Sequence, residues 1–297
     1  MKFLFKIIKL LRVKHWIKNS FIVAPLVFSE SFLNQVAITK TFFAFCAFSL
    51  IASIVYVIND LADIEKDKVH PKKCKRPLAS GDISKTQAFI IICVLVLIDI
   101  IFFTLLNFVT SLIIICYFIM NLFYTFSLKK KVIIDVMIVA IGFVLRIYVG
   151  ATAISVEISN WLILCTLFIS LFLGFGKRRH EFIIMDTDRN SHKAVLDFYS
   201  RQLLNYLIII SITLTIISYS LYTIDIVTIN KLGTDKLILT IPFVVYGLFR
   251  YMYNIYRKEG GGDPADVVYK DKTIFLTVFF YIVVVVLIFA LKKYNLF

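Results

Sequence analysis

The sequence predicts an all-α membrane protein, and three observations support this class. Sixty per cent of its 297 residues are hydrophobic, more than a soluble chain of this length could bury. Apolar stretches of about 20 residues, the length of a membrane-spanning helix, recur along the whole chain. Within these stretches apolar and polar residues do not alternate as they do in the strands of a membrane β-barrel.

We predict nine membrane-spanning helices in one membrane domain that covers residues 1–297. The first span is the weakest, because Lys18, Asn19, Pro25 and Glu30 interrupt its apolar run. The nine predicted spans are residues 16–34, 40–58, 87–106, 108–127, 133–154, 159–176, 203–224, 237–256 and 274–291.

Residues 1–14 precede the first span and predict an amphipathic helix that lies in the membrane interface. On a helix, basic side chains of this segment gather on one face and apolar side chains on another. The two faces carry Lys2, Lys6 and Lys9 on one side and Phe3, Ile7 and Leu10 on the other.

The distribution of charge predicts the orientation in the membrane. Most of the 33 Lys and Arg residues lie in the N-terminal segment and in the loops after predicted helices 2, 4, 6 and 8. The positive-inside rule places these parts in the cytoplasm and the C-terminus outside, in a cell (inner or plasma) membrane. Anionic headgroups and a phosphorylated substrate explain the net charge of +14, so we expect no nucleic-acid partner.

The stretch NDLADIEKDKVHPKKCKRPLASG begins at Asn59, directly after an apolar run. On a helix, Tyr56, Asn59, Asp63 and Asp67 share one face, and Asp60 lies beside it. Carboxylates on one face repel each other unless a cation lies between them. Oxygen ligands of this kind suit Mg²⁺, which commonly bridges to substrate phosphates.

We predict two cytoplasmic active-site loops, residues 59–86 and 177–202. In the first loop, Lys73 and Arg76 offer positive charge to the same phosphates. A solvated loop of mixed charge is the alternative explanation, but the acids begin at the membrane edge in helical register, which favours the metal–phosphate interpretation.

The motif NDxxDxxxDxxHPxKxxRPxAxG resembles the first Asp-rich motif of the UbiA superfamily of intramembrane prenyltransferases. The resemblance implies nine helices around a central cavity, with Mg²⁺ binding the diphosphate of an activated donor. It makes Asn59 and Asp63 the first candidates for metal contacts and Asp60 and Asp67 nearby carboxylates. It also implies that Asp60, Asp63 and Asp67 form the catalytic group.

The second predicted loop, GFGKRRHEFIIMDTDRNSHKAVLDFYS, lacks the DxxxD motif of members that prenylate aromatic rings. Its basic start suits an acceptor that is itself a phosphate. We predict that Lys177 and Arg178 hold this phosphate, that Glu181 orients them, and that Tyr199 belongs to the same site.

Further stretches, among them VKHWIKN and YGLFRYMYNIY, resemble the decaprenyl-phosphate phosphoribosyltransferase branch of the superfamily nearly end to end. This branch implies transfer of phosphoribose from 5-phosphoribosyl 1-diphosphate (PRPP) to a polyprenyl phosphate, for cell-envelope glycan synthesis. The additional substrate-binding candidates that it implies are Lys18, Tyr56, Lys129, Arg146 and Arg250.

Several alternatives stay open at this point. Arg146 could instead form an internal salt bridge, for example with Asp99, and Lys18 could extend to the membrane interface. The chain could be a prenyltransferase that moves a polyprenyl group from its diphosphate to an aromatic acceptor. It could also be a transporter or flippase. A homo-oligomer is compatible with the sequence but not indicated by it.

Overall fold

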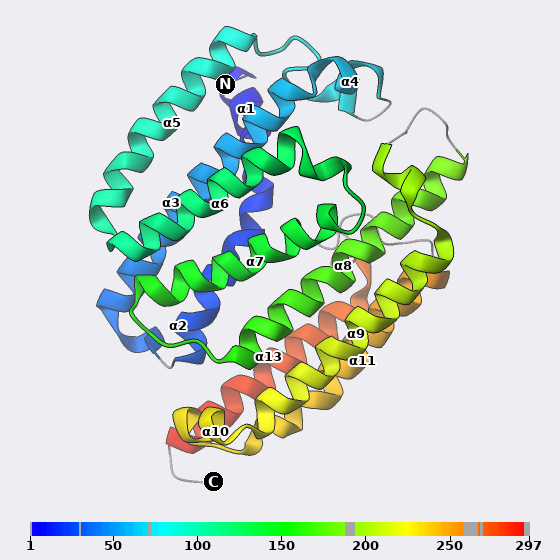
Figure 1. Ribbon diagram of the computed structural model, residues 1–297. Helices are drawn as coiled ribbons and strands as arrows, with labels where there is room; N and C mark the ends of the chain where they lie inside the picture. Colours follow the sequence, from blue (N-terminus) through cyan, green and yellow to red (C-terminus); the bar gives the residue numbers. More distant parts are fainter. Residues whose placement is uncertain are drawn as a thin grey trace. The chain divides into compact units, whose positions relative to one another are not determined.

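The computed structural model describes residues 2–29, 31–70, 73–187, 194–257, 267 and 270–293. All regular structure in this part of the chain is helical (Figure 1). Eight of the described helical segments are long and apolar enough to cross a membrane, which confirms the all-α membrane class. They are Gln35–Ala62, Lys85–Leu105, Phe108–Phe126, Ile134–Ala153, Asn160–Ile184, Arg201–Ile224, Lys236–Arg257 and Lys272–Lys292.

The first predicted span, residues 16–34, is not among these eight, so the count of nine is not confirmed. Its residues contribute to the 3₁₀-helix η1 (Val13–Val23), to α2 (Ala24–Phe28) and to η2 (Ser31–Leu33). Pro25 lies in the first turn of α2, where its missing N–H is tolerated. Asn19, which interrupts the apolar run, is buried and donates a hydrogen bond to Ser49 at 2.8 Å.

The described residues form two compact units, one up to Ile158 and one from Ser159 onward. Besides η1, α2 and η2, the first unit contains α1 (Lys2–Leu10), α3 (Gln35–Ala62), α4 (Ile64–Val69), η3 (Lys73–Lys75), α5 (Lys85–Leu105), α6 (Phe108–Phe126), η4 (Leu128–Lys130) and α7 (Ile134–Ala153). The second unit contains α8 (Asn160–Thr187), η6 (Ala194–Phe198), α9 (Arg201–Ile224), α10 (Ile226–Leu232), η7 (Lys236–Thr240), α11 (Ile241–Arg257) and α13 (Lys272–Lys293).

Helix α3 is the centre of the first unit and packs against α5, α6, α7 and η1. Its buried face is rich in small residues, which let neighbouring helices approach closely. These small buried residues are Ala44, Ala47, Ser49, Ala52 and Ser53. The backbones of α7 and η1 also touch, because a Cβ atom added to Gly150 would lie 2.0 Å from the carbonyl oxygen of Ile22. The N-terminal segment is therefore packed firmly against the helices that carry the polar residues.

The second unit is built on the packing of α8 against α9 and of α11 against α13. Helix α8 continues to Thr187, well past the predicted end of its span at residue 176. Its basic continuation is made of good helix formers, and Arg178 pairs with Glu181 one turn later. The predicted loop 177–202 therefore begins as helix, and its residues 188–193 lie outside the described part.

Candidate active site

The acidic stretch lies where α3 ends and α4 begins. Asp63 caps α3, and its amide donates to the Asn59 carbonyl oxygen at 3.0 Å. The Asp67 amide donates in turn to the Asp63 carbonyl oxygen at 2.8 Å. Because the helical path nearly continues from α3 into α4, residues one or two turns apart stay close together. Asp60 and Asp67 are buried, whereas Asn59 and Asp63 are partly exposed.

Asp60 and Asp67 share one cation. The Nη1 atom of Arg76 lies 3.0 Å from Oδ1 of Asp60 and 2.6 Å from Oδ2 of Asp67. The Nζ atom of Lys73 lies 3.9 Å from the other oxygen of Asp67. Both basic residues that the sequence predicts as phosphate ligands thus lie against the acids of the same stretch.

Asn59 and Asp63 form a second group with Lys129. The Nζ atom of Lys129 lies 2.7 Å from Oδ2 of Asp63 and 3.4 Å from Oδ1 of Asn59. The acids predicted from one helical stretch are thus divided between two cations, with Asp60 and Asp67 on Arg76 and Asn59 and Asp63 on Lys129.

Sequence reasoning missed Arg12, which reaches this site from the N-terminal segment. Its Nη2 atom donates to Oδ1 of Asp60, and its guanidinium lies over the Tyr56 ring, 4.7 Å from the centroid. The Tyr56 ring also meets His15 edge-on, with centroids 5.6 Å apart. The only sequence signal was one more basic residue within the amphipathic segment of residues 1–14. Lys18 lies half-buried on η1.

Arg146 lies buried in α7 and hydrogen-bonds to neutral oxygen atoms. Its Nε donates to Oδ1 of Asn19 at 2.9 Å, its Nη1 to the Gly142 carbonyl at 2.7 Å, and its Nη2 to the Tyr117 hydroxyl at 3.3 Å. Its guanidinium carbon also lies 4.7, 5.1 and 5.1 Å from the ring centroids of Phe48, Tyr117 and Phe143. These contacts hold the side chain in one orientation.

The salt bridge considered between Arg146 and Asp99 does not form. Asp99 is buried in α5, and neither of its carboxylate oxygens has a hydrogen-bond partner among the described residues. An intramembrane carboxyl in such surroundings is costly in its charged form. The buried charge of Arg146 is instead dispersed over neutral dipoles and aromatic faces.

The consecutive basic residues Lys177, Arg178 and Arg179 on α8 lie in two different environments. Arg178 donates to Glu181 at 2.5 Å, and Lys177 precedes it half-buried on α8. Arg179, which the sequence did not single out, is buried. It donates to Oδ1 of Asn205 at 2.9 Å and to the Ile255 carbonyl at 3.0 Å, linking α8 to α9 and α11. Tyr199, just after η6, is buried as well.

Arg250 on α11 pairs with Asp271, the residue before α13. Its Nη2 atom lies 3.1 Å from Oδ2 of Asp271, and Asn254 donates to the same oxygen at 2.9 Å. The backbone amides of Thr273 and Ile274 donate to Oδ1. Burial alone would raise the pKa of Asp271, but the hydrogen bonds from Asn254, Arg250 and Ile274 hold it well below its ordinary value.

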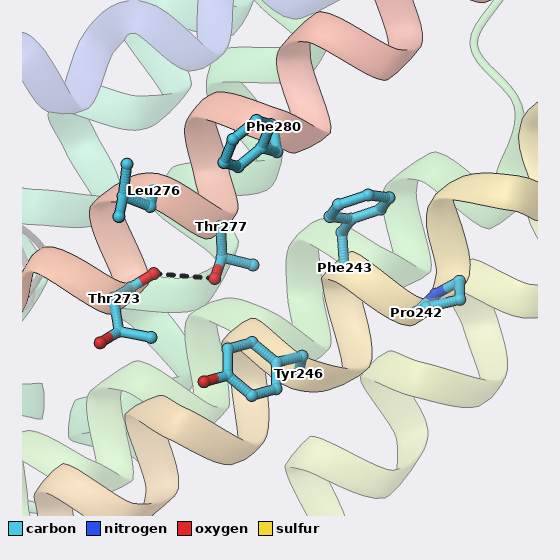
Figure 2. Close-up of a pocket in the computed structure, with 7 residues that line it drawn as sticks. All are labelled: Pro242, Phe243, Tyr246, Thr273, Leu276, Thr277 and Phe280. Carbon is cyan, nitrogen blue, oxygen red and sulfur yellow. Dashed lines mark hydrogen bonds between the residues drawn. The ribbon is translucent and has the colours of Figure 1, made fainter.

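A shallow pocket of about 320 Å³ lies between α11 and α13 in the second unit (Figure 2). Thr277 donates its hydroxyl hydrogen to the Thr273 carbonyl at 2.8 Å, so this hydroxyl is engaged within its own helix. The lining suits an apolar chain better than a phosphate. Its residues are Pro242, Phe243, Tyr246, Thr273, Leu276, Thr277 and Phe280.

The oxygen atoms at the junction of α3 and α4 match the ligand preference of Mg²⁺. Among the described residues, no group of three or more His, Cys, Asp or Glu side chains is arranged to hold a metal ion. Arg76 nevertheless shows that Asp60 and Asp67 can hold a positive charge between them, and Lys129 shows the same for Asp63 with Asn59. The donor set therefore fits Mg²⁺ in its chemistry.

The fold and these side chains define a multi-pass membrane protein with a combined acidic and basic site at the end of a membrane span. The model of the UbiA prenyltransferase family matches residues 22–269, and the chain belongs to this family. Both the predicted family and the predicted UbiA-like fold are thereby confirmed.

Similar proteins include two that bear the name decaprenyl-phosphate phosphoribosyltransferase. The one from Mycolicibacterium smegmatis is 30% identical, over 90% of this chain and 87% of its own length. The one from Corynebacterium glutamicum is also 30% identical, over 90% of this chain and 81% of its own. A UbiA homolog from Archaeoglobus fulgidus, solved with DMAPP and Mg²⁺, has a TM-score of 0.70 and 15% identity, covering 96% of this chain and 99% of that one.

Proposed function

We propose that the protein transfers 5-phosphoribose from PRPP to a polyprenyl phosphate and releases diphosphate. The observation that carries this proposal is the nearly full-length similarity to relatives named decaprenyl-phosphate phosphoribosyltransferase. The product is a lipid-linked phosphoribose of the kind that cell-envelope glycan synthesis uses. A soluble, highly anionic donor and an isoprenoid acceptor also suit a basic site at the end of a membrane span.

The donor site belongs to the first unit. Asn59, Asp60, Asp63 and Asp67 would hold Mg²⁺, which when bound supplies positive charge to the leaving diphosphate. Phosphoribosyl transfer needs this neutralisation, because negative charge grows on the leaving group as the anomeric carbon becomes cationic.

Basic side chains of the first unit complete the donor site. Arg76, Lys73 and Lys129 lie at the acids and are placed to pair with donor phosphates. Tyr56, Lys18 and Arg146 remain predicted substrate contacts. The acceptor phosphate is already ionised at neutral pH, so its attack on the anomeric carbon needs no general base.

We assign the acceptor phosphate to the basic side chains of the second unit. Lys177 and Arg178 supply positive charge, and Glu181 orients Arg178. Tyr199 and Arg250 are further candidates. The protein would act in the cell membrane, with its N-terminus and active site in the cytoplasm and its C-terminus outside.

The test supplies PRPP, Mg²⁺ and a polyprenyl phosphate to the purified protein in lipid and identifies the lipid product by mass spectrometry. We expect a phosphoribosylated lipid, and Asp63→Asn to lower its formation by at least about a hundredfold. Transfer from a polyprenyl diphosphate to an aromatic acceptor would instead identify a prenyltransferase. Substrate flux without any product would identify a transporter.

A further inference from the structure

Asp60 is held by two cations that come from distant parts of the chain. Arg76 belongs to the acidic stretch itself, whereas Arg12 precedes Asp60 by 48 residues. Both guanidinium groups bond to the same oxygen, Oδ1, of a carboxylate that is only 2% exposed. Arg76 also pairs with Asp67, so Arg12 is the second cation that balances these two buried carboxylates.

The backbone of Arg12 is in an uncommon conformation. It has φ 51° and ψ 45°, the left-handed region, which costs a residue other than glycine about 1–2 kcal/mol. This residue separates α1 from η1 and accepts a hydrogen bond from the His15 amide at 2.7 Å. The turn lays the guanidinium over Tyr56 and against Asp60. A strained residue that aims a charge at a candidate site points to a role in that site.

The rest of the N-terminal segment is anchored without Arg12. Lys6 pairs with Asp82 at 2.6 Å, and Lys9 donates to the Lys75 carbonyl oxygen at 2.6 Å. Leu10 is fully buried in a cluster with Val57 and other apolar residues. The Arg12 side chain can therefore leave Asp60 while α1 stays in place.

A divalent ion at Asp60 would compete with Arg12, because both bind the same carboxylate and their like charges repel. Moving the Arg12 guanidinium away from Asp60 costs free energy unless another anion pairs with it. A diphosphate that arrives with the metal supplies that anion.

We propose that Arg12 is the built-in counter-ion of Asp60 and sets the metal affinity of the site. It holds Asp60 until a metal and a diphosphate bind together, so that the metal is taken up with the donor rather than alone. This inference rests on the proposed function, because it assumes that the acids bind the metal of a diphosphate substrate.

The experiment measures protein-bound Mn²⁺, a probe for Mg²⁺, by water-proton relaxation with the full-length protein in nanodiscs. Titrations are run with and without inorganic pyrophosphate and corrected for the Mn²⁺–pyrophosphate complex. For the wild type we expect pyrophosphate to strengthen Mn²⁺ binding at least about tenfold. Arg12→Gln should bind Mn²⁺ alone about tenfold more tightly and lose most of the gain from pyrophosphate.

Two control variants make this result specific. Arg12→Lys keeps the charge and the backbone conformation and should behave like the wild type. Lys9→Gln removes a charge from the same segment, three residues before Arg12. Because Lys9 bonds to the Lys75 carbonyl oxygen and not to the acids, this variant should also behave like the wild type. Thermal melting in nanodiscs verifies that each variant is folded.

Three results would overturn the inference. One is Arg12→Gln binding Mn²⁺ alone no more tightly than the wild type. Another is equal tightening in Lys9→Gln, which would indicate a general effect of charge. The third is unchanged Mn²⁺ affinity in Asp60→Asn, which would place the metal elsewhere. In each case the separate assay of phosphoribosyl transfer to lipid still tests the proposed function.

Discussion

At the scale of single residues, two buried arginines show how this protein places charge away from water. Arg146 and Arg179 both donate to an asparagine side-chain oxygen and to a backbone carbonyl, and both lie against aromatic rings. Asn19 and Asn205 thereby act as neutral acceptors within helical packing. Partners of this kind make the orientation of a cation specific, because each N–H has one acceptor in one direction.

Replacing Arg146 tests whether these contacts stabilise the fold. Arg146→Ala leaves the Asn19 oxygen and the Tyr117 hydroxyl without this partner, so we expect a loss of about 3 kcal/mol and a clearly lower melting temperature. Arg146→Lys should recover only part of this stability, because a lysine ammonium lacks the planar fork that aims separate N–H groups at these three acceptors. Unchanged melting with weakened PRPP binding would assign this arginine to the substrate alone.

Asp271 gives a prediction about pH. Its pKa is depressed in the folded protein, so its stabilising contribution is present above the ordinary aspartate pKa of about 3.9. The contribution starts to decrease as the pH falls below this ordinary value and is lost as the pH falls through the depressed value. Asp271→Asn keeps a residue suited to cap α13 but removes the charge that faces Arg250. We expect it to be less stable by about 2 kcal/mol at pH 7.

The pH dependence is measured by thermal melting in nanodiscs between pH 7 and pH 3. The difference between the wild type and Asp271→Asn should shrink toward the acidic end of this range. A difference that stays constant over the whole range would show that the carboxylate charge of Asp271 does not contribute.

At the scale of elements, η1 is the segment whose conformation the sequence did not predict. It was expected as the start of a membrane-spanning α-helix, yet it is a 3₁₀-helix of 11 residues, an uncommon length for this conformation. Its close contact with α7 explains how it is held, since Gly150 leaves room for the Ile22 carbonyl. A side chain at position 150 would push the two backbones apart.

Gly150→Ala should therefore destabilise the first unit by at least about 3 kcal/mol, at the upper end of the usual cost of overpacking. Gly247→Ala on α11 is the matched control, because its added Cβ would lie 3.5 Å from Cγ2 of Thr277, an ordinary contact. The two variants are compared by their melting temperatures. Equal melting temperatures would mean that η1 and α7 can separate at little cost.

At the scale of the whole molecule, the N-terminal segment before α3 is long enough to cross the membrane. The 11 residues of η1 rise by roughly 22 Å at about 2.0 Å each. The five residues of α2 add about 7 Å. The sum is close to the roughly 30 Å of a bilayer core. We therefore propose that this segment makes a ninth crossing in addition to the eight long helices.

Nine crossings put the two chain ends on opposite sides of the membrane, and eight put them on the same side. A periplasmic-type reporter such as alkaline phosphatase, fused after Phe297, should be active, whereas a cytoplasmic fluorescent reporter at the same place should not. The same reporters fused after Ile158 and Lys131 calibrate the two sides. The reverse result at the C-terminus would reject the predicted orientation. The ninth crossing is tested at the other end of the chain: the variant Lys2→Cys should react with a membrane-impermeant thiol reagent only in permeabilised cells, and reaction in intact cells above the wild-type background would reject the ninth crossing.

The amino-acid sequence alone was enough to predict the all-α membrane class, the approximate positions of eight spans and most of the acidic and basic residues of the candidate site. These features depend on composition and on spacing along one helix, which are local. Helix limits were less accurate, because the basic continuation of α8 and the extended start of α3 follow from packing and ion pairs rather than from hydropathy.

Which of these groups become partners, in contrast, depends on tertiary packing. Arg12 meets Asp60 across 48 positions, and Arg146 meets Asn19 across 127. Asp67 pairs with Asp60 through Arg76, although sequence spacing favoured Asn59 and Asp63 as its neighbours. Charge and helical register show that a carboxylate needs a cation. Which cation it receives depends on how separate segments pack, because ion pairs and hydrogen bonds act over a few ångströms in space and not along the chain.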